Sequence, residues 1–271
     1  MPELPEVETT RRGIAPHLLG KCLQRLDVRQ SSLRWPVSPE LESCVVGKRL
    51  SAVDRRGKYL LFCFDTGCML VHLGMSGSLR IVQRREDPRF HDHVDLDFGP
   101  DLVLRFHDPR RFGAILWAGD NWQQHPLLAH LGPEPLLESF TAEYLFGRSR
   151  GRRQAVKAFI MDSRIVVGVG NIYANEALFK AGIRPSRAAG AISRQRYARL
   201  VDEIRSTLAE AIEQGGTTLR DFVGGDGSPG YFQQQLLVYG RGGEACRVCQ
   251  RQLRESRLGQ RSTVYCSKCQ T

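Results

Sequence analysis

The stretch KYLLFCFDTGCMLVHL (58–73) decides the architecture of the first half of the chain. It holds two β-rich runs on either side of the turn-forming residues Asp65-Thr66-Gly67, which is the pattern of two antiparallel strands. Four more short β-rich runs follow it. They are SLRIVQ (78–83), HVDLDF (93–98), LVLRF (102–106) and AILWA (114–118). We therefore predict antiparallel strands packed as a sandwich or flattened barrel over about 58–118.

The regions on either side of these strands are predicted to be helical. Residues 4–14 form a predicted short helix, because Pro5 suits a first turn and two glutamates complement the positive end of the helix dipole. From residue 193 to 214 apolar residues recur at helical spacing, and Gly215-Gly216 follow as a stop signal. The stretch HLGPEPL (130–136) suits a linker. A β domain and a helical domain are therefore expected.

The charge balance narrows the class of partner. The chain has 39 Lys and Arg against 29 Asp and Glu, a net charge of +10 at pH 7, and a pI near 9.5. Such an excess indicates a polyanionic partner, either nucleic acid or an acidic membrane surface. No basic amphipathic helix, lipidation signal or run of roughly 18 apolar residues supports a membrane. We therefore expect nucleic acid and no membrane partner.

The C-terminal tail carries the most specific motif. Cys246-Arg-Val-Cys249 and Cys266-Ser-Lys-Cys269 are separated by sixteen residues, which is the spacing of a four-cysteine zinc site. Four thiolates leave no open coordination position, so we expect one structural Zn²⁺. Seven basic residues against two acidic ones in this tail suit contact with phosphates, with a solvated basic surface as the alternative.

The remaining cysteines are Cys22, Cys44, Cys63 and Cys68. They are scattered among apolar residues, so we expect them to be small core residues. The opening MPELPEVETT has neither the basic stretch nor the apolar run of a secretory signal. We therefore expect no disulfide among these four cysteines.

The run IVVGVGNIYA (165–174) is close to a dinucleotide-binding fingerprint, but it lacks the required context. That fold needs a βαβ unit and an acidic residue about 20 positions further on, and no Asp or Glu lies between Glu176 and Asp202. We predict instead a glycine-rich turn that leads into a helix at Asn171. Its exposed amides suit a phosphate of a nucleic-acid backbone, although tight helix packing explains the glycines equally well.

Other stretches suit contact with nucleic acid less specifically. HDPRRFG (107–113) places two arginines beside Phe112, which suits an aromatic wedge in a base stack, although a buried Phe with solvated arginines is the alternative. Met75 in the turn-rich LGMSGS is equally ambiguous. His91 and His93 fall on one face of a predicted strand, but spacing places no third metal ligand. A polar face or a phosphate contact is favoured there over a metal.

Taken in order, the motifs of this chain resemble those of the bacterial formamidopyrimidine-DNA glycosylase family, and they cover nearly its whole length. The motifs are PELPEVET (2–9), RRGKYL (55–60), HLGMSGSLR (72–80), HDHVDL (91–96), DPRRFG (108–113), HLGPEPL (130–136), VVGVGNIYANEAL (166–178), QGGTTLRDF (214–222), GSPGYF (227–232), VYGR (238–241) and QRSTVYCSKC (260–269).

The resemblance implies an α+β fold with an N-terminal antiparallel β-sandwich, a helix–two-turn–helix domain and a C-terminal four-cysteine zinc finger. It places the catalytic sandwich in 1–130, with a linker and the start of the helical domain in 131–150. The DNA-binding helical domain follows in 151–236 and the zinc finger in 237–271. The family acts on damaged double-stranded DNA in bacteria, so a monomer in the cytoplasm, associated with the nucleoid through DNA, is expected.

The resemblance also implies an activity. The family removes oxidised purines, chiefly 8-oxoguanine and formamidopyrimidines, and then nicks the abasic site by β,δ-elimination. Its nucleophile is an N-terminal proline amine, which here is Pro2 once Met1 is removed. This amine attacks C1′ of a nucleotide that has left the stack and forms a Schiff base. Apart from the resemblance, the alternative interpretation of Pro2 is a mere leader residue.

The other functional positions follow the same resemblance. Glu3 matches the general acid and Glu6 a second carboxylate that orders the site, although both also suit a helix dipole. Lys58 and Arg261 match the residues that contact phosphate and assist elimination, although Lys58 also suits a strand-edge charge. The residues that fill the gap in the DNA or contact its backbone correspond to Met75, Arg110, Phe112, His91, Arg152, Lys157 and Asn171. The loop 217–231 corresponds to the segment that closes over the lesion.

Two other readings compete. Endonuclease VIII shares the proline chemistry and prefers oxidised pyrimidines, but it usually has glycine at the position of Leu4. It also lacks the set formed by Met75 and Arg110-Arg111-Phe112. A non-catalytic zinc-ribbon protein that binds DNA would satisfy the charge and the cysteines, but not the set Pro2, Glu3 and Lys58.

Overall fold

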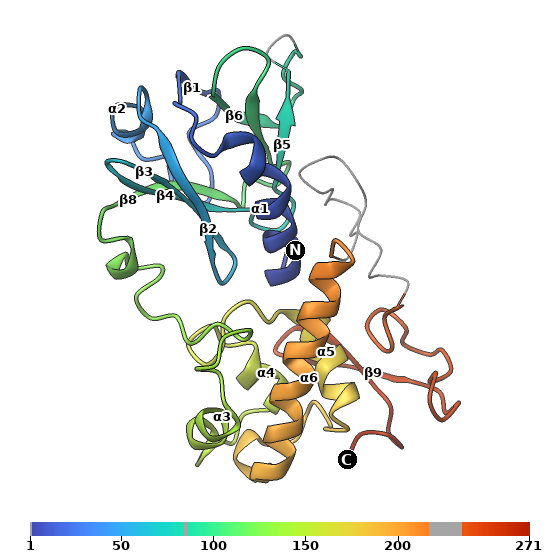
Figure 1. The fold of residues 1–271 in the computed structure, drawn as a ribbon. Helices are drawn as coiled ribbons and strands as arrows, with labels where there is room; N and C mark the ends of the chain where they lie inside the picture. The colour runs from blue at the N-terminus through green and yellow to red at the C-terminus, as the bar shows by residue number, and fades with distance from the viewer. Residues whose placement is uncertain (1, 84–85, 217–234) are drawn as a thin grey trace. The chain divides into compact units, whose positions relative to one another are not determined.

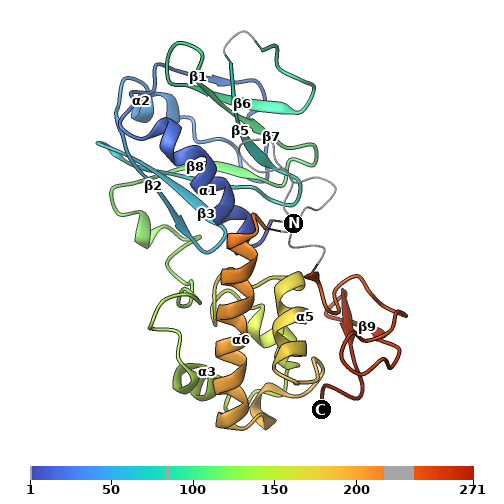
Figure 2. The same cartoon turned by 45° about the vertical axis from the view of Figure 1, so that its right-hand side comes forward.

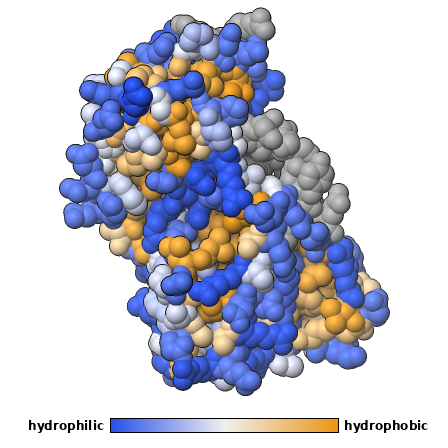
Figure 3. Space-filling model, in the orientation of Figure 1, coloured by the Kyte–Doolittle hydropathy of each residue, from blue (hydrophilic) through white to orange (hydrophobic). Residues whose placement is uncertain are grey.

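The computed structural model describes residues 2–83, 86–216 and 235–271 (Figure 1). These residues divide into two compact units, 2–129 with 214–216 and 130–213 with 235–271. Within this described part of the chain, no helix is long and apolar enough to cross a membrane. Hydrophilic residues cover much of the face shown in Figure 3, as expected for a chain with 25% charged residues.

The first unit contains two four-stranded antiparallel sheets, ordered β2-β3-β4-β8 and β1-β6-β7-β5. The strands are β1 (Arg25–Val28), β2 (Leu50–Arg56), β3 (Tyr59–Phe64), β4 (Gly67–His72), β5 (Ser78–Val82), β6 (Asp92–Asp97), β7 (Val103–His107) and β8 (Ala114–Gly119). One cluster of buried apolar residues joins the sheets, since Phe62 and Ile115 of the first meet Val94 and Phe106 of the second. The predicted antiparallel sandwich is confirmed.

Helix α1 (Leu4–Leu18) lies against β2 and β5, an edge strand of each sheet (Figure 2). Its buried face, which includes Val7 and Ile14, joins the core of the sandwich. The helix continues about one turn beyond the predicted end at residue 14, and Pro16 lies within this last turn. Helix α2 (Leu41–Val45) and the 3₁₀ turn η1 (Trp122–Gln124) complete the unit.

The second unit is helical and ends in a small hairpin module. Its elements are α3 (Ala142–Ser149), α4 (Val156–Ile160), α5 (Asn171–Lys180), the 3₁₀ turn η2 (Ala189–Ala191), α6 (Arg194–Glu213), β9 (Arg254–Leu258) and β10 (Arg261–Tyr265). Helix α6 confirms the predicted helix to within one residue at each end. All the apolar positions that predicted it are buried, and α3 and α5 pack against it.

The hairpin β9–β10 presents Arg261 directly after a tight turn. Leu258 pairs with Arg261, so only Gly259 and Gln260 form the loop, with φ values of 55° and 64°. Positive φ at both loop residues is the type I′ geometry, whose twist matches that of the paired strands. Leu253 and Val264 pack with Phe179 of α5 in the core of the module. The position of Arg261 is therefore determined by the hairpin register and by α5.

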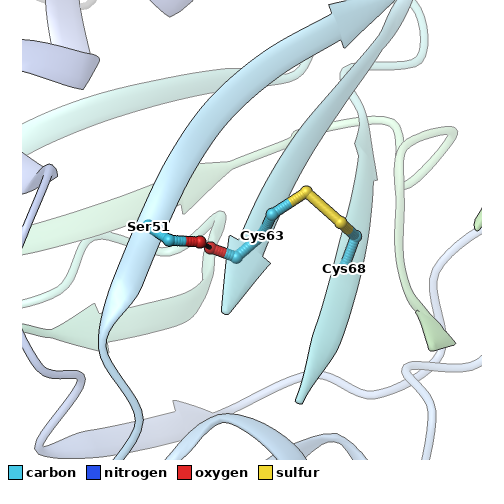
Figure 4. Close-up of a disulfide and its surroundings, with 3 residues drawn as sticks. All are labelled: Ser51, Cys63 and Cys68. Atoms are coloured by element: carbon cyan, nitrogen blue, oxygen red, sulfur yellow. Dashed lines mark hydrogen bonds between the residues drawn. A yellow bond between two sulfur atoms is a disulfide. The ribbon is translucent and has the colours of Figure 1, made fainter. Parts of the chain in front are cut away.

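Cys63 and Cys68 form a disulfide (Figure 4), and the expectation of no disulfide among the scattered cysteines was wrong. The register of β3 and β4 places the two residues directly opposite each other, with their Cα atoms 4.0 Å apart. Side chains of such a cross-strand pair share one face of the sheet. Cys22 is exposed and Cys44 is half-buried, so of the four only Cys68 is a buried residue.

A cluster of charges anchors α1 to β2. The buried carboxylate of Glu8 accepts hydrogen bonds from Arg11, Arg12 and Arg55 at 2.8–3.1 Å. Arg11 also donates to the carbonyl oxygen of Val53 at 3.2 Å. Burial raises the pKa of the Glu8 carboxyl, but the three guanidinium groups outweigh it and lower the pKa to about 2. Glu8 therefore contributes to stability as a charged group.

We predict that thiol alkylation will reveal the disulfide. In denaturant with a chelator and no reductant, intact-mass measurement should show six labelled cysteines, because six are free. After reduction, all eight should be labelled. The double variant Cys63→Ser/Cys68→Ser is the control and should give six labels under both conditions. Labelling of all eight cysteines in the unreduced wild type would show that the bond is absent.

We predict that Glu8→Gln lowers the free energy of unfolding by about 2–3 kcal/mol at pH 7. The folded pKa lies below the ordinary value of 4.5, so the contribution is full above pH 4.5 and is lost as the pH falls toward about 2. Urea denaturation between pH 7 and pH 3 should show the two proteins converging in acid.

The exposed Glu138 supplies the matched control for this measurement. Glu138→Gln should change the free energy of unfolding by less than about 0.5 kcal/mol. An effect of Glu8→Gln that stays constant through the acid range would contradict the role given to its charge.

Candidate active site

The N-terminal end of α1 is fixed by a pair of buried carboxylates. Glu3 is 2% exposed and Glu6 is fully buried. The Glu3 N–H donates to Glu6 Oε2 at 2.8 Å, and the Glu3 side chain accepts in return from the backbone of Glu6, which makes a reciprocal capping box. Pro2 is buried and directly precedes this cap. Met1 lies outside the described residues.

Lys58 lies in the turn between β2 and β3, next to a histidine that the sequence analysis missed. The ring of His72 lies 4.8 Å from that of Tyr59, and its Nδ1 accepts the Gly74 N–H at 2.9 Å. Burial, and then the positive charges of Lys58 and Arg34, lower the pKa of His72 to about 4. The imidazole is therefore neutral at pH 7 and carries its hydrogen on Nε2.

Asp108 organises the turn 108–113. It is fully buried, and its carboxylate accepts hydrogen bonds from Ser76 Oγ at 2.8 Å and from the Gly113 N–H at 2.7 Å. The turn and the loop of Ser76 also touch backbone to backbone. A Cβ on Gly74 would come within 2.4 Å of the Phe112 carbonyl carbon, so this approach requires glycine. Asp108 therefore joins the two loops that carry Met75, Arg110 and Phe112.

The three side chains on these loops remain accessible. Met75 is 39% exposed and Phe112 is 42% exposed, although both are large and apolar. The Arg110 guanidinium carbon lies 4.9 Å from the centre of the Phe112 ring, within the range of a cation–π contact. The structure thus brings together an apolar pair and a cation on two loops that Asp108 joins. The sequence signal for Asp108 was available, since Asp before Pro initiates turns.

His91 is joined to the same turn through its backbone. Its carbonyl oxygen accepts the Asp108 N–H at 3.0 Å, and His93 Nε2 donates to the Asp108 carbonyl oxygen at 2.9 Å. His91 also lines a cavity of about 520 Å³ together with Arg89, Phe90 and other residues. Among the described residues, the only group of three or more side chains with metal-ligand geometry is the cysteine cluster, and His91 and His93 do not belong to it.

In the second unit, Lys157, Asn171 and Arg261 come together around β10. Lys157 Nζ and Asn171 Nδ2 both donate to the carbonyl oxygen of Ser262, at 2.8 and 3.1 Å. Arg261, the preceding residue, is exposed, whereas Lys157 is 1% exposed. Two predicted site residues are therefore linked through one carbonyl group, and the third, Arg261, directly precedes it in the chain.

Arg152 is not part of that cluster. It is exposed in the connection between α3 and α4, where its carbonyl oxygen accepts the Gly190 N–H at 2.9 Å. The glycine-rich run before α5 forms a turn in which Gly168 has φ of 81°, and every sheet among the described residues is antiparallel. A parallel dinucleotide-binding unit is thus absent from the described part, as predicted.

The four tail cysteines converge on one point. All four Sγ atoms lie within 4.8 Å of one another, with Cys246–Cys269 at 3.9 Å and Cys249–Cys266 at 3.4 Å. Zinc–sulfur bonds of about 2.3 Å in a tetrahedron give sulfur separations of about 3.8 Å. The four thiol donors and the distances between them therefore match a structural metal site.

Comparisons with known proteins agree with this geometry. Residues 1–115 match the formamidopyrimidine-DNA glycosylase N-terminal domain, and residues 131–223 match the formamidopyrimidine-DNA glycosylase H2TH domain. The chain is 63% identical over 270 residues to a formamidopyrimidine-DNA glycosylase of Cellvibrio japonicus, with the full length of both covered.

Two solved complexes of Lactococcus lactis Fpg are similar in structure. One contains DNA with an abasic site and has a TM-score of 0.91 at 31% identity. The other contains Fapy-dG DNA and has a TM-score of 0.90 at 30% identity. Each comparison covers 99% of both chains. The chain belongs to the formamidopyrimidine-DNA glycosylase family.

Proposed function

We propose that this protein is a bifunctional base-excision repair enzyme that removes oxidised purines from double-stranded DNA and then cleaves the strand at the abasic site. The observation that carries the proposal is the capping box that fixes Glu3 and Glu6 directly behind Pro2. Family members from Lactococcus lactis bind DNA with an abasic site and DNA with Fapy-dG, which supports the same substrate class here.

Pro2 is the proposed nucleophile, provided that Met1 is removed. Its secondary amine attacks C1′ of the extruded nucleotide, the bond from C1′ to the base breaks, and the base leaves with a proton. Opening of the sugar ring converts the adduct into an iminium, a protonated Schiff base. The iminium acidifies the 2′ hydrogen, whose loss expels the 3′ phosphate in β-elimination. A second elimination expels the 5′ phosphate.

Glu3 is the proposed general acid, because it is the carboxylate next to the nucleophile and can deliver a proton to the ring oxygen as the sugar opens. Glu6 holds the Glu3 N–H and so orders this end of the chain. A buried carboxylate that has no hydrogen bond would be costly. The capping box satisfies one oxygen of Glu6 and keeps the tip of α1 in a single geometry.

The remaining site residues are proposed to hold the DNA. Lys58 and Arg261 would contact phosphates and assist elimination, and Asn171, at the start of α5, would offer a phosphate the positive end of that helix. Met75, Arg110 and Phe112 would fill the gap left by the extruded base. Their partial exposure on loops held by Asp108 suits a wedge. His91 and Arg152 would contact the DNA backbone, and the proposed lesion loop 217–231 lies outside the described residues.

The cysteine cluster is proposed to bind one Zn²⁺ through Cys246, Cys249, Cys266 and Cys269. The sulfur spacing fits a tetrahedral ion, and a closed four-thiolate shell stabilises a fold without taking part in chemistry. We propose that the ion maintains the hairpin that carries Arg261.

The domain boundaries and the setting complete the proposal. We propose a catalytic domain in 1–130, a linker with the start of the helical domain in 131–150, a DNA-binding domain in 151–236 and a finger in 237–271. Because the proposed substrate is bacterial DNA, we place the protein in the cytoplasm at the nucleoid. We propose that it acts as a monomer.

We predict that borohydride will trap a covalent adduct between the protein and duplex DNA with 8-oxoguanine opposite cytosine. Pro2→Gly should lower the rate of excision by about 100-fold or more, since the nucleophile is altered, and should leave duplex binding within about twofold. Pro16→Ala, which changes an exposed proline of the same helix, is the control and should keep wild-type turnover.

Two outcomes of this experiment would reject parts of the proposal. Mass spectrometry must first show that the N-terminus is Pro2. If such a protein gives no adduct, the enzymatic proposal is rejected in favour of a non-catalytic DNA-binding protein. Preferential trapping on oxidised pyrimidine would favour the endonuclease VIII activity over the proposed one.

We predict that Cys249→Ser releases the metal and weakens duplex binding by about tenfold or more, because the hairpin loses its support. The zinc content measured by elemental analysis should fall from about one Zn²⁺ per chain to a trace. Cys22→Ser, at an exposed cysteine outside the cluster, should retain both zinc and affinity. Tight DNA binding by a zinc-free Cys249→Ser protein would contradict the role of the finger.

A further inference from the structure

Lys157 is a buried cation that binds the hairpin module. Its residue is 1% exposed, although a lysine ammonium normally reaches water. Its Nζ donates to the carbonyl oxygen of Ser262 at 2.8 Å and to Thr263 Oγ1 at 2.7 Å. Both acceptors belong to β10, about 105 residues away along the chain. Such a charge is tolerated inside a protein only where hydrogen bonds replace its hydration.

The bonds from Lys157 continue to Arg261. Thr263 Oγ1, which accepts from Lys157, donates in turn to the carbonyl oxygen of Arg261 at 3.2 Å. Ser262 lies between Arg261 and Thr263, and its carbonyl oxygen accepts from Lys157 Nζ and also from Asn171 Nδ2. The carbonyl groups of two successive residues, Arg261 and Ser262, are therefore tied to one ammonium group, the first through the Thr263 hydroxyl and the second directly.

Other buried polar side chains of α5 support the same segment. Asn175 is fully buried, and its Oδ1 accepts the Val264 N–H at 3.0 Å while its Nδ2 donates to the Asn171 carbonyl at 2.6 Å. Glu176 is 1% exposed and accepts three backbone N–H groups, those of residues 237–239, at 2.8–2.9 Å. The entrance and the second strand of the module are thus both held by α5.

We propose that Lys157 is a positioning residue that sets the place of Arg261, and that it does not itself contact DNA phosphate. The inference rests on the proposed function of Arg261. Burial withholds the Lys157 ammonium from a phosphate, whereas Arg261 is exposed at the end of the type I′ turn. A long arginine side chain reaches a defined point only if its backbone is fixed, and Lys157 fixes that backbone through Ser262 and Thr263.

A double-mutant cycle separates the two roles of Lys157. Lys157→Met keeps most of the side-chain volume and removes the donor, and Arg261→Ala removes the group that is positioned. Single-turnover cleavage of duplex with an abasic site reports the ratio of δ- to β-elimination product. Lys157→Met should lower that ratio by about tenfold, as a misplaced catalytic group does. The double variant should match Arg261→Ala, because the two residues act in series.

Salt dependence of duplex binding gives a readout that does not need catalysis. In the Arg261→Ala background, adding Lys157→Met should leave the slope of log K against log salt unchanged. A buried positioning residue releases no counterion. A slope reduced by a further ~0.9 would mean that Lys157 neutralises a phosphate, and would overturn the proposal. If wild type fails to cut abasic DNA, the proposed function fails, while this binding cycle still decides the role of Lys157.

A second variant guards against a folding defect in Lys157→Met. Thr263→Val keeps Lys157 and removes only the hydroxyl that links it to the Arg261 carbonyl. It should retain zinc and the wild-type melting temperature within a few degrees, and should shift the product ratio in the same direction by a smaller factor. A wild-type ratio in both zinc-loaded variants would overturn the proposal.

Discussion

Glu6 accepts the backbone N–H of Glu3 at 2.8 Å, and both residues are buried. Terminal residues normally fray, because only one side of the chain restrains them. The capping box restrains the first turn of α1. Glu8, in the next turn, adds a second restraint because it accepts a hydrogen bond from Arg55 of β2. The position of Pro2, and the chemistry proposed for it, depend on carboxylates that are themselves held inside the first unit.

The same physical device recurs wherever a functional side chain has to be placed. Asp108 holds the turn of Arg110 and Phe112, Lys157 holds the strand of Arg261, and Glu176 holds the chain that enters the module. Removing a charge from water costs several kcal/mol unless close hydrogen bonds replace its hydration. Each of these groups therefore has little freedom, and the backbone segments that satisfy it share that restriction.

The spacing of apolar residues predicted the helices and strands that pack through an apolar face. It missed strands that are rich in charged residues. Helix α6 and six strands were predicted, whereas β1 and β2 were missed because Arg25–Val28 and Leu50–Arg56 are rich in charge. Strand β6 was predicted, but not its polar core: Asp95 is buried, and each of its two oxygens accepts from both Arg29 and Arg105, at 2.7–3.0 Å. The disulfide followed from strand register, which alternation along one strand does not specify.

The sequence motifs could identify the exposed residues of the candidate site. They could not show which buried side chains, such as Asp108 and Lys157, hold the backbone of those residues, because these contacts form only in the folded chain. The motifs pointed to Met75, Arg110, Phe112 and Arg261, which the structure leaves exposed or partly exposed. Flexible side chains lose rotamer entropy when they bind, at about 0.5–1.5 kcal/mol each. A backbone that is already fixed by Asp108 or Lys157 limits the loss to those side chains. The buried charges thus shift the cost of ordering from DNA binding to folding, where the whole core offsets it.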